Sequence, residues 1–481
     1  MSRLAVALVA LALVVPATAA GSGAFAPDDP LAARQWYLGA IHAFDYWPVP
    51  PTDLAPVRVA VIDSGLDVDH PEFAGRVALT QSFVGGDVAD KQGHGTFVAG
   101  IIGAALDNAV GIAGIAFPAE LLIAKVVRSD GTIAPAEEAK AIRWAVDNGA
   151  QVINLSLGGL RDPLNRKRDT FSQVESNAIE YAYRRGAVLV AAIGNGDDAP
   201  RIPWFYGSYP AALPHVIGVS ALSPSGNVPT FSNRDLIYND MSAPGQEIYS
   251  TLPRTMTAQR PTCVNQGYSD CGPDEFRHAS GTSFAAPQVA AAAAVLLALR
   301  PTLTPDQVMN VLERTATDVN AGTGCKQCAL QRDPLSGWGR LDISHAVAAL
   351  DGVLPLPDRF EPNDDAGTHA VFLPRAVKSL RATLDFWDDQ IDVYRVPLKA
   401  RERLVLDLEG PKATTVNLLL WRPGTKRVTS IRGQELRVAQ AIRPGPSQRL
   451  GYRAKTGGNY FLEVKLATRG AGSYTLGIKR G

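Results

Sequence analysis

The segment SGTSFAAP occupies residues 280–287 and runs directly into an alanine- and leucine-rich stretch that ends near Arg300. Small residues flank Ser283, and the apolar stretch after it predicts a long buried helix. At a helix start, unpaired backbone N–H groups and the helix dipole favour negative charge. The ordinary role of a serine there is to cap the helix. Whether Ser283 is instead a nucleophile depends on the groups that the fold brings to it.

Buried-type strands alternate with helical patterns upstream of this segment. The clearest strand is the β-branched run 57–63, which ends in Asp63 and a glycine turn. We expect further strands at 121–127, 152–157, 187–193 and 216–220, and helices at 97–105, 135–148 and 171–185. This alternation predicts an α/β fold, with a parallel sheet covered by helices on both faces. Chemical groups in such sheets gather at the carboxyl ends of the strands.

Four polar residues stand in glycine-flanked turns at the strand ends and helix starts: Asp63, His94, Asn195 and Ser283. Peptide cleavage by a serine needs a base, a carboxylate that orients the base, and donors for the oxyanion. Taken singly, an aspartate or an asparagine in a turn and a hydrogen-bonded histidine are ordinary structural residues. Taken together, they match the separate roles that a serine hydrolase requires.

The sequence around these residues resembles the catalytic motifs of the subtilase family of serine endopeptidases. The matching segments are VIDSG at 61–65, GHGTFVAG at 93–100, AIGN at 192–195 and GTSFAAP at 281–287. The order Asp, His, Ser also differs from that of other serine hydrolase families. The resemblance implies that Asp63 orients His94, that His94 is the general base and acid, that Ser283 is the nucleophile, and that Asn195 completes the oxyanion hole.

The same resemblance suggests a substrate-binding segment, made of Ser156, Leu157, Gly158 and Gly159. In the family this exposed strand pairs with an extended substrate by β-augmentation. The alternative is an ordinary strand end. No cofactor is expected for catalysis.

A structural calcium site is a further expectation from the resemblance. The loop 106–112 is similar to the one that wraps calcium in many subtilases, so Asn108 would be a ligand, with Glu72 completing the oxygen cage. Family members often carry aspartate where Glu72 stands, which leaves the presence of calcium open.

Residues 1–20 have the pattern of a secretory signal peptide, with Arg3, an apolar core and small residues at 17–20. The apolar core is shorter than the roughly 20 residues of a membrane span, so we expect export and no stable membrane insertion. Only a short segment separates the predicted cleavage site from the catalytic domain. We therefore expect none of the long N-terminal propeptides that many subtilases carry.

Four cysteines in an exported chain suggest two disulfides. We favour local pairing, Cys263 with Cys271 and Cys325 with Cys328, among the three connectivities that are possible. The alternatives for the Cys325–Cys328 pair, a redox or metal motif, lack a thioredoxin-like setting or a second pair.

The character of the sequence changes at the Leu-Pro-Leu-Pro segment 354–357, which marks the expected domain boundary. The predicted catalytic domain is 21–352, and a C-terminal domain follows at 353–481. Short alternating segments such as 392–396, 404–408 and 460–466 predict a small all-β sandwich. The segment DRFEPND at 358–364, with DQIDVY at 389–394 and GSYTL at 472–476, resembles bacterial pre-peptidase C-terminal domains. The alternative is a solubilising tail.

The charge balance excludes a strong nucleic-acid footprint, since 47 basic residues offset 47 acidic ones. The expected partners are protein or peptide substrates, and the chain is expected to be a monomer. A catalytically silent binding protein and a processing enzyme with one dedicated partner are the alternatives. The remaining histidines carry no motif, and packing or turn hydrogen bonds are the roles expected of His70, His215 and His278.

Overall fold

The computed structural model describes residues 25–46, 54–257, 275–352, 354, 358–361, 363–367, 369–386, 389–428 and 435–481. The predicted signal peptide and the Cys263–Cys271 pair lie outside these residues. Cys325 and Cys328 form a disulfide, as predicted.

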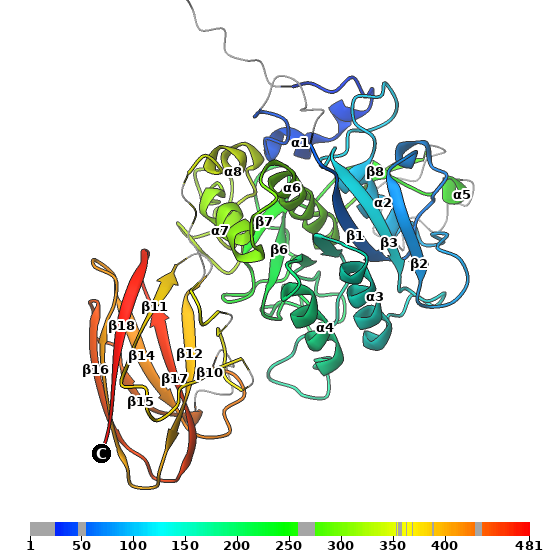
Figure 1. Ribbon diagram of the computed structural model, residues 1–481. Coiled ribbons are helices and arrows are strands. Elements are labelled where there is room, and N and C mark those ends of the chain that lie inside the picture. The colour runs from blue at the N-terminus through cyan, green and yellow to red at the C-terminus, as the bar shows by residue number, and fades with distance from the viewer. Residues whose placement is uncertain are drawn as a thin grey trace, which may run out of the picture.

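Seven parallel strands form the central sheet, in the spatial order β2-β3-β1-β4-β5-β6-β7 (Figure 1). Their bounds are β1 Val57–Asp63, β2 Val77–Ser82, β3 Ala119–Lys125, β4 Val152–Leu155, β5 Val188–Ala192, β6 Val216–Leu222 and β7 Met241–Pro244. The five strands predicted from the sequence lie in this sheet, with ends shifted by at most a few residues. Strands β2 and β7, at its two edges, were not predicted.

Helices cover both faces of the sheet, as the continuous apolar strands require. Within β1, Val57, Val59 and Val61 pack into one core with α2 His94–Gly103 and α6 Ala286–Leu299. The alternate residues Ala60 and Ile62 pack into the other core, with α3 Pro135–Asp147 and α4 Gln173–Tyr183. The predicted α/β fold is confirmed.

Helix α6 is the central buried helix of the molecule. Every residue from Gln288 to Leu297 is at most 3% exposed. The stretch Thr282–Leu299 is long and apolar enough to cross a membrane, but 89% of it is buried inside the fold. Packing against β1, β4 and β5 therefore accounts for its apolar composition.

Smaller elements complete the N-terminal part. They are the helices α1 Trp36–Ala40, α5 Arg254–Thr257, α7 Pro305–Thr315 and α8 Ile343–Ala349, the 3-10 turns η1 Ala32–Arg34, η2 Pro71–Phe73 and η5 Thr282–Phe284, and the antiparallel pair β8 Ile248–Thr251 and β9 Phe276–Ala279. Helix α7 begins with a capping box, in which the Thr304 hydroxyl accepts from the Gln307 amide and the Gln307 side chain accepts from the Thr304 amide.

The C-terminal part is a sandwich of two sheets (Figure 1). One sheet has the order β10-β12-β17-β14-β15 and the other β11-β18-β13-β16. The bounds are β10 Val371–Phe372, β11 Ser379–Asp385, β12 Ile391–Leu398, β13 Arg403–Glu409, β14 Val416–Trp421, β15 Arg437–Ala441, β16 Ser447–Arg453, β17 Gly458–Leu466 and β18 Ala471–Arg480. Alternate residues such as Leu404, Leu406 and Leu408 fill the shared core. The predicted all-β architecture is confirmed, and the boundary between 352 and 353 stays a prediction.

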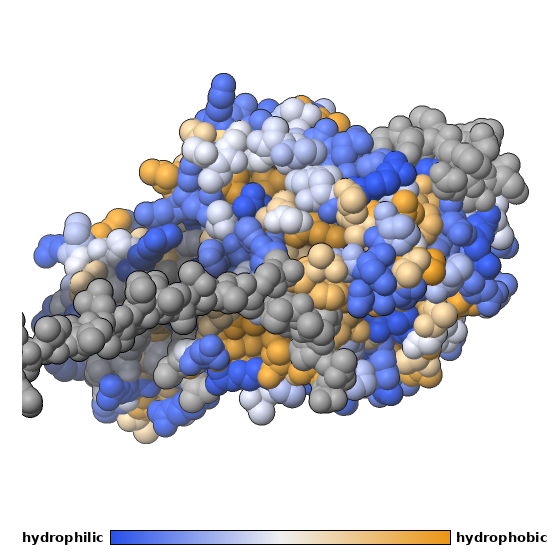
Figure 2. Space-filling model, turned by 90° about the horizontal axis from the view of Figure 1, so that it is seen from above, coloured by the Kyte–Doolittle hydropathy of each residue, from blue (hydrophilic) through white to orange (hydrophobic). Residues whose placement is uncertain are grey.

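The surface is mixed in character. Seen from above in Figure 2, hydrophobic residues are interspersed with hydrophilic ones over the coloured surface. Large exposed apolar side chains such as Leu164, Leu236 and Leu330 come from separate loops.

Candidate active site

Asp63 and His94 meet at the carboxyl end of β1. Asp63 is the last residue of this strand, and His94 is the first residue of α2. The His94 Nδ1 and the Asp63 Oδ1 lie 2.8 Å apart, and the same carboxylate oxygen accepts from the Ser64 amide at 2.7 Å. Close packing enforces this approach, because a Cβ on Gly95 would lie 2.3 Å from the Gly65 carbonyl oxygen. The Asp63 carboxyl is therefore buried and fixed, and it faces one ring nitrogen of His94.

Asp90 builds the turn that presents His94. It is 3% exposed, and its Oδ1 accepts from the Gly93 amide at 2.8 Å and from the Ser64 hydroxyl at 2.9 Å. Its Oδ2 accepts from the amide and the hydroxyl of Thr96, both at 2.8 Å. The sequence analysis missed this residue, although a short-range signal was present in an aspartate placed four residues before a histidine at a helix start.

The electrostatic surroundings of His94 favour its protonated form. Burial by itself lowers the pKa of the imidazolium. The charge and the hydrogen bond of Asp63, with a smaller contribution from Asp90, raise this pKa by more than burial lowers it. The net effect is a pKa above the ordinary histidine value. Nδ1 faces Asp63, so the other nitrogen, Nε2, is the one available to exchange a proton with a substrate or a nucleophile.

Ser283 lies in η5, directly before α6, and Pro287 occupies the first turn of that helix. The ring of the next residue, Phe284, packs against the His94 ring with their centroids 5.4 Å apart. The backbone carbonyl of Ser283 accepts from the Ser156 hydroxyl at 2.7 Å. These contacts fix the backbone on both sides of the serine, and they place its neighbour Phe284 against His94.

Asn195 adjoins the same turn through its side-chain oxygen. Its Oδ1 accepts from both the amide and the hydroxyl of Thr282, each at 2.9 Å. The Thr282 hydroxyl also accepts from the Gly194 amide at 3.2 Å. Because Oδ1 is engaged by Thr282, the orientation of the Asn195 amide is fixed, and its Nδ2 group is the part that can donate to a ligand.

A small pocket adjoins Ser283 and Asn195. Its lining includes Leu157, Gly158 and Gly159 of the predicted substrate segment, together with Asp197 and Asp198. The Gly159 amide donates to the Tyr209 carbonyl and the Tyr209 amide donates back, both at 2.9 Å, which fixes one end of the segment. Ser156 is 2% exposed and lies beneath Ser283. Pairing of this segment with substrate stays a prediction.

The predicted calcium loop is held by hydrogen bonds within the loop and from Glu72 and Asp29 outside it. Asn108 Oδ1 accepts from the Val110 amide at 2.9 Å, and Glu72 Oε1 accepts from the Ile112 amide at 2.8 Å. The carboxylate of Asp29 accepts from the amides of Asp107 and Asn108. The other oxygen of Glu72 is buried without a hydrogen-bond partner, and burial raises the Glu72 pKa to about 8.

This orphan oxygen fits a cation ligand. Glu72 contacts the loop that carries Asn108 through the Ile112 amide, so these two residues are the ones that would hold a structural calcium. Calcium binding stays a prediction.

An α/β fold that places an aspartate–histidine pair and a serine turn at the carboxyl ends of parallel strands is the arrangement of a serine hydrolase. Residues 55–329, more than half of the chain, match the subtilase family, peptidase S8. The chain belongs to this family and is a subtilisin-like serine endopeptidase.

Individual relatives agree with this assignment. The chain is 36% identical over 267 residues to subtilisin DY of Bacillus licheniformis, a match that covers 55% of this chain and 85% of the relative. It is 32% identical over 304 residues to thermitase of Thermoactinomyces vulgaris, covering 62% and 94%. Among solved structures, sphericase superposes with a TM-score of 0.51 at 28% identity, covering 64% of this chain and 97% of sphericase.

Proposed function

We propose that the chain is a secreted endopeptidase in which Ser283 is the nucleophile, His94 the general base and acid, Asp63 the orienting carboxylate and Asn195 an oxyanion donor. The observation that carries the proposal is the hydrogen bond of 2.8 Å between Asp63 and His94. The His94 ring also packs against Phe284, the residue that follows Ser283. Protein or peptide chains are the substrates.

The chemistry divides into two halves. The Ser283 Oγ attacks the scissile carbonyl carbon while His94 Nε2 takes the proton of the Ser283 hydroxyl. The resulting imidazolium passes that proton to the leaving amine. The C–N bond breaks, and an acyl-enzyme remains on Ser283. A water then loses a proton to His94 and attacks the acyl carbon. The bond from that carbon to the Ser283 Oγ breaks, His94 returns the proton to this oxygen, and the acid is released. Asp63 stays ionised throughout and stabilises the imidazolium.

The oxyanion forms where donors are already in place. The Asn195 Nδ2 and the Ser283 backbone N–H are the donors that this proposal assigns to it. Because Thr282 holds the Asn195 oxygen, the amide needs no reorientation when negative charge develops.

The cellular setting belongs to the same proposal. Residues 1–20 are removed during export, the catalytic domain is 21–352, and residues 353–481 form an appended sandwich domain. The protein acts as a monomer. These assignments rest on the sequence pattern of the N-terminus and on the change of architecture near residue 353.

Labelling with a fluorophosphonate, which reacts with activated serines, tests the proposal. We expect the wild type to be labelled and to cleave a mixed peptide library, and the Ser283→Ala variant to do neither. Ser225→Ala, at an exposed loop serine, is the matched control and is expected to behave as wild type. Folded wild type that takes no label would favour a catalytically silent binding protein, and cleavage of only one library sequence would favour a dedicated processing enzyme.

A further inference from the structure

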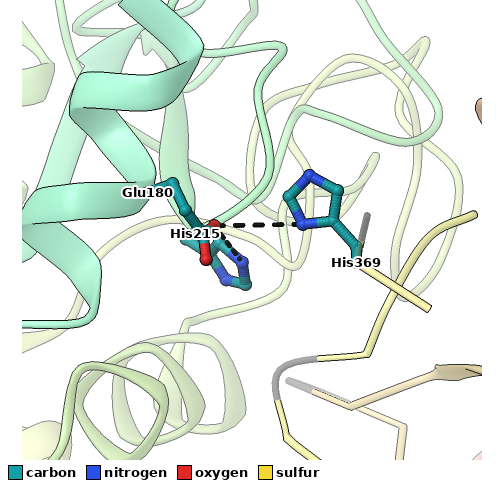
Figure 3. A group of neighbouring side chains, drawn as sticks. All are labelled: Glu180, His215 and His369. Atoms are coloured by element: carbon teal, nitrogen blue, oxygen red, sulfur yellow. Dashed lines mark ion pairs between the residues drawn. The ribbon is translucent and has the colours of Figure 1, made fainter. Parts of the chain in front are cut away.

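Three side chains with metal-binding chemistry meet away from the active site (Figure 3). Glu180 belongs to α4, His215 directly precedes β6, and His369 comes from the C-terminal part, two residues before β10. One ligand atom from each lies within 4.8 Å of the other two. The sequence analysis assigned His215 to packing and gave His369 no role.

The distances within this group are too long for direct hydrogen bonds. The His215 Nε2 lies 3.5 Å and the His369 Nδ1 lies 3.9 Å from the Glu180 Oε2. Hydrogen bonds between nitrogen and oxygen in proteins measure about 2.7–3.2 Å. Two ligands on a tetrahedral zinc ion, each about 2.0–2.1 Å from it, lie about 3.3 Å apart. The spacing therefore suits an ion between the groups, after small adjustments of the side chains.

The members from the catalytic domain are held in position before an ion binds. The His215 ring stacks on Tyr183 with centroids 3.8 Å apart and planes within 11°. Arg184 pairs with the Glu180 Oε1, which leaves Oε2 turned toward the histidines. Arg184 already balances the charge of Glu180, so an ion pair with protonated histidines is the weaker explanation of the cluster.

The two histidines differ in their exposure to solvent. The His215 side chain is only 6% exposed. His369 is more open, with 29% of its side chain exposed. His215 also borders a cavity of about 1160 Å³ lined by both parts of the chain, which gives an ion a path to the site.

We propose that Glu180, His215 and His369 form a zinc site that ties the C-terminal part of the chain to the catalytic domain. Two imidazoles and one carboxylate suit Zn²⁺ and related transition metals, whereas Ca²⁺ prefers oxygen ligands alone. His215 directly precedes the amino end of β6, and Asp63 stands at the carboxyl end of β1. Because the strands are parallel, the ion lies at the opposite ends of the strands from the active site. The role is structural.

Metal binding to the full-length Ser283→Ala protein tests the proposal, because this background removes self-cleavage. The protein is stripped with a chelator and titrated with Zn²⁺ by calorimetry, and with Co²⁺ by visible absorption. We expect a single site with the strong absorption of tetrahedral cobalt. His369→Ala and His215→Asn should each weaken binding by at least about tenfold, since loss of even an outer partner of a ligand has such an effect.

Controls separate this site from chance binding. His345→Ala removes a histidine that is 70% exposed and should leave binding unchanged. Zinc should raise the Tm of the parent and not that of His369→Ala. Because His215 has a backbone φ of +64°, its replacement is asparagine, which tolerates that conformation. Absence of zinc binding to the folded parent, or binding of equal strength in His369→Ala, overturns the proposal.

Discussion

Asn195 uses the two ends of its side-chain amide for different tasks. Because Thr282 occupies Oδ1, the proposed catalytic contribution is confined to Nδ2. Asn195→Ala is expected to lower kcat by about 100- to 1000-fold with little change in KM, a loss of about 2.7–4 kcal/mol that is known from the corresponding donor of subtilisin, a member of the same family. Steady-state kinetics on a peptide substrate measure both constants.

A second variant separates the donor from the acceptor. Asn195→Asp keeps an oxygen for Thr282 and replaces the donor by a charged oxygen, so its kcat should fall at least as far as that of Asn195→Ala. Recovery of kcat in Asn195→Asp would contradict the donor role and assign the effect to the Thr282 contacts.

The raised pKa of His94 predicts the acidic limit of activity. The general base must be neutral, so kcat/KM should fall as the pH drops through this pKa. Asp90→Asn removes a negative charge that helps to raise the pKa, and the acidic limb of the profile should therefore move to lower pH, by a fraction of a pH unit.

The profile itself distinguishes charge from turn geometry. The control is Asp87→Asn, at an exposed aspartate of the same loop, which should leave the limb in place. A loss of activity in Asp90→Asn with an unshifted limb would mean that Asp90 acts only through the hydrogen bonds of the turn.

Residues embedded in motifs were predictable, and residues defined by distant contacts were not. Asp63, His94, Asn195 and Ser283 stand in glycine-rich turns of characteristic composition. The contacts of Asp90 with Ser64 and Thr96 depend on two turns that meet only in the folded chain, and the surrounding residues 87–92 show no periodicity. The same holds for a side chain such as His369, whose neighbour Glu180 is far away in sequence.

At the scale of elements, helices α3 and α4 pack through two buried carboxyl groups, Glu138 and Glu175. Burial, and for Glu138 the neighbouring Glu175, raises both pKa values, that of Glu175 to about 7. An unfolded carboxyl ionises at its ordinary pKa of 4.5, whereas the folded one stays protonated up to its raised pKa. Stability is therefore fully present below the ordinary value and is lost as the pH rises from there to the raised value. The Tm of the Ser283→Ala protein should fall as the pH rises from about 5 to about 7.

The Glu138→Gln variant should flatten this dependence, because it removes one titrating carboxyl and keeps the shape of the side chain. The matched control is Glu137→Gln, at the adjacent position, where the carboxylate pairs with Arg128 in a more exposed setting. The three proteins are compared by calorimetry between pH 5 and pH 9, a range that extends about two units on either side of the Glu175 pKa. An equal slope in Glu138→Gln and in the parent would refute the assignment.

Long periodic elements were predicted well, and short ones were missed for physical reasons. The strands β1 and β6 read as continuous apolar runs because both of their faces are buried. Strand β7 has only four residues and ends in Pro244, which lacks an N–H group and suits an edge strand. The strands β8 and β9 pair although they lie far apart in the sequence, so local pattern gives no sign of their pairing.

At the scale of the whole molecule, two of the contacts between the parts of the chain lie near α7 and the end of β11. The Arg314 guanidinium lies 2.9 Å from the Asp385 carboxylate, and the rings of Trp338 and Phe386 pack edge to face with centroids 5.2 Å apart. These contacts border the cavity of about 1160 Å³. Because the ion pair and the ring contact each join one part of the chain to the other, both should contribute to the coupling between the parts.

Arg314→Ala should therefore weaken the coupling by about 1 kcal/mol, the order expected for a partly exposed ion pair. In calorimetry of the Ser283→Ala background, the unfolding transitions of the sandwich and of the catalytic domain should move apart. Arg381→Ala, which alters the same strand at an exposed position within the sandwich, should leave their separation unchanged. Because the proposed zinc site joins the same two parts, added Zn²⁺ should restore the coupling in Arg314→Ala and fail to do so when His369→Ala is also present. Transitions that stay together in Arg314→Ala without zinc would show that the ion pair does not contribute to the junction.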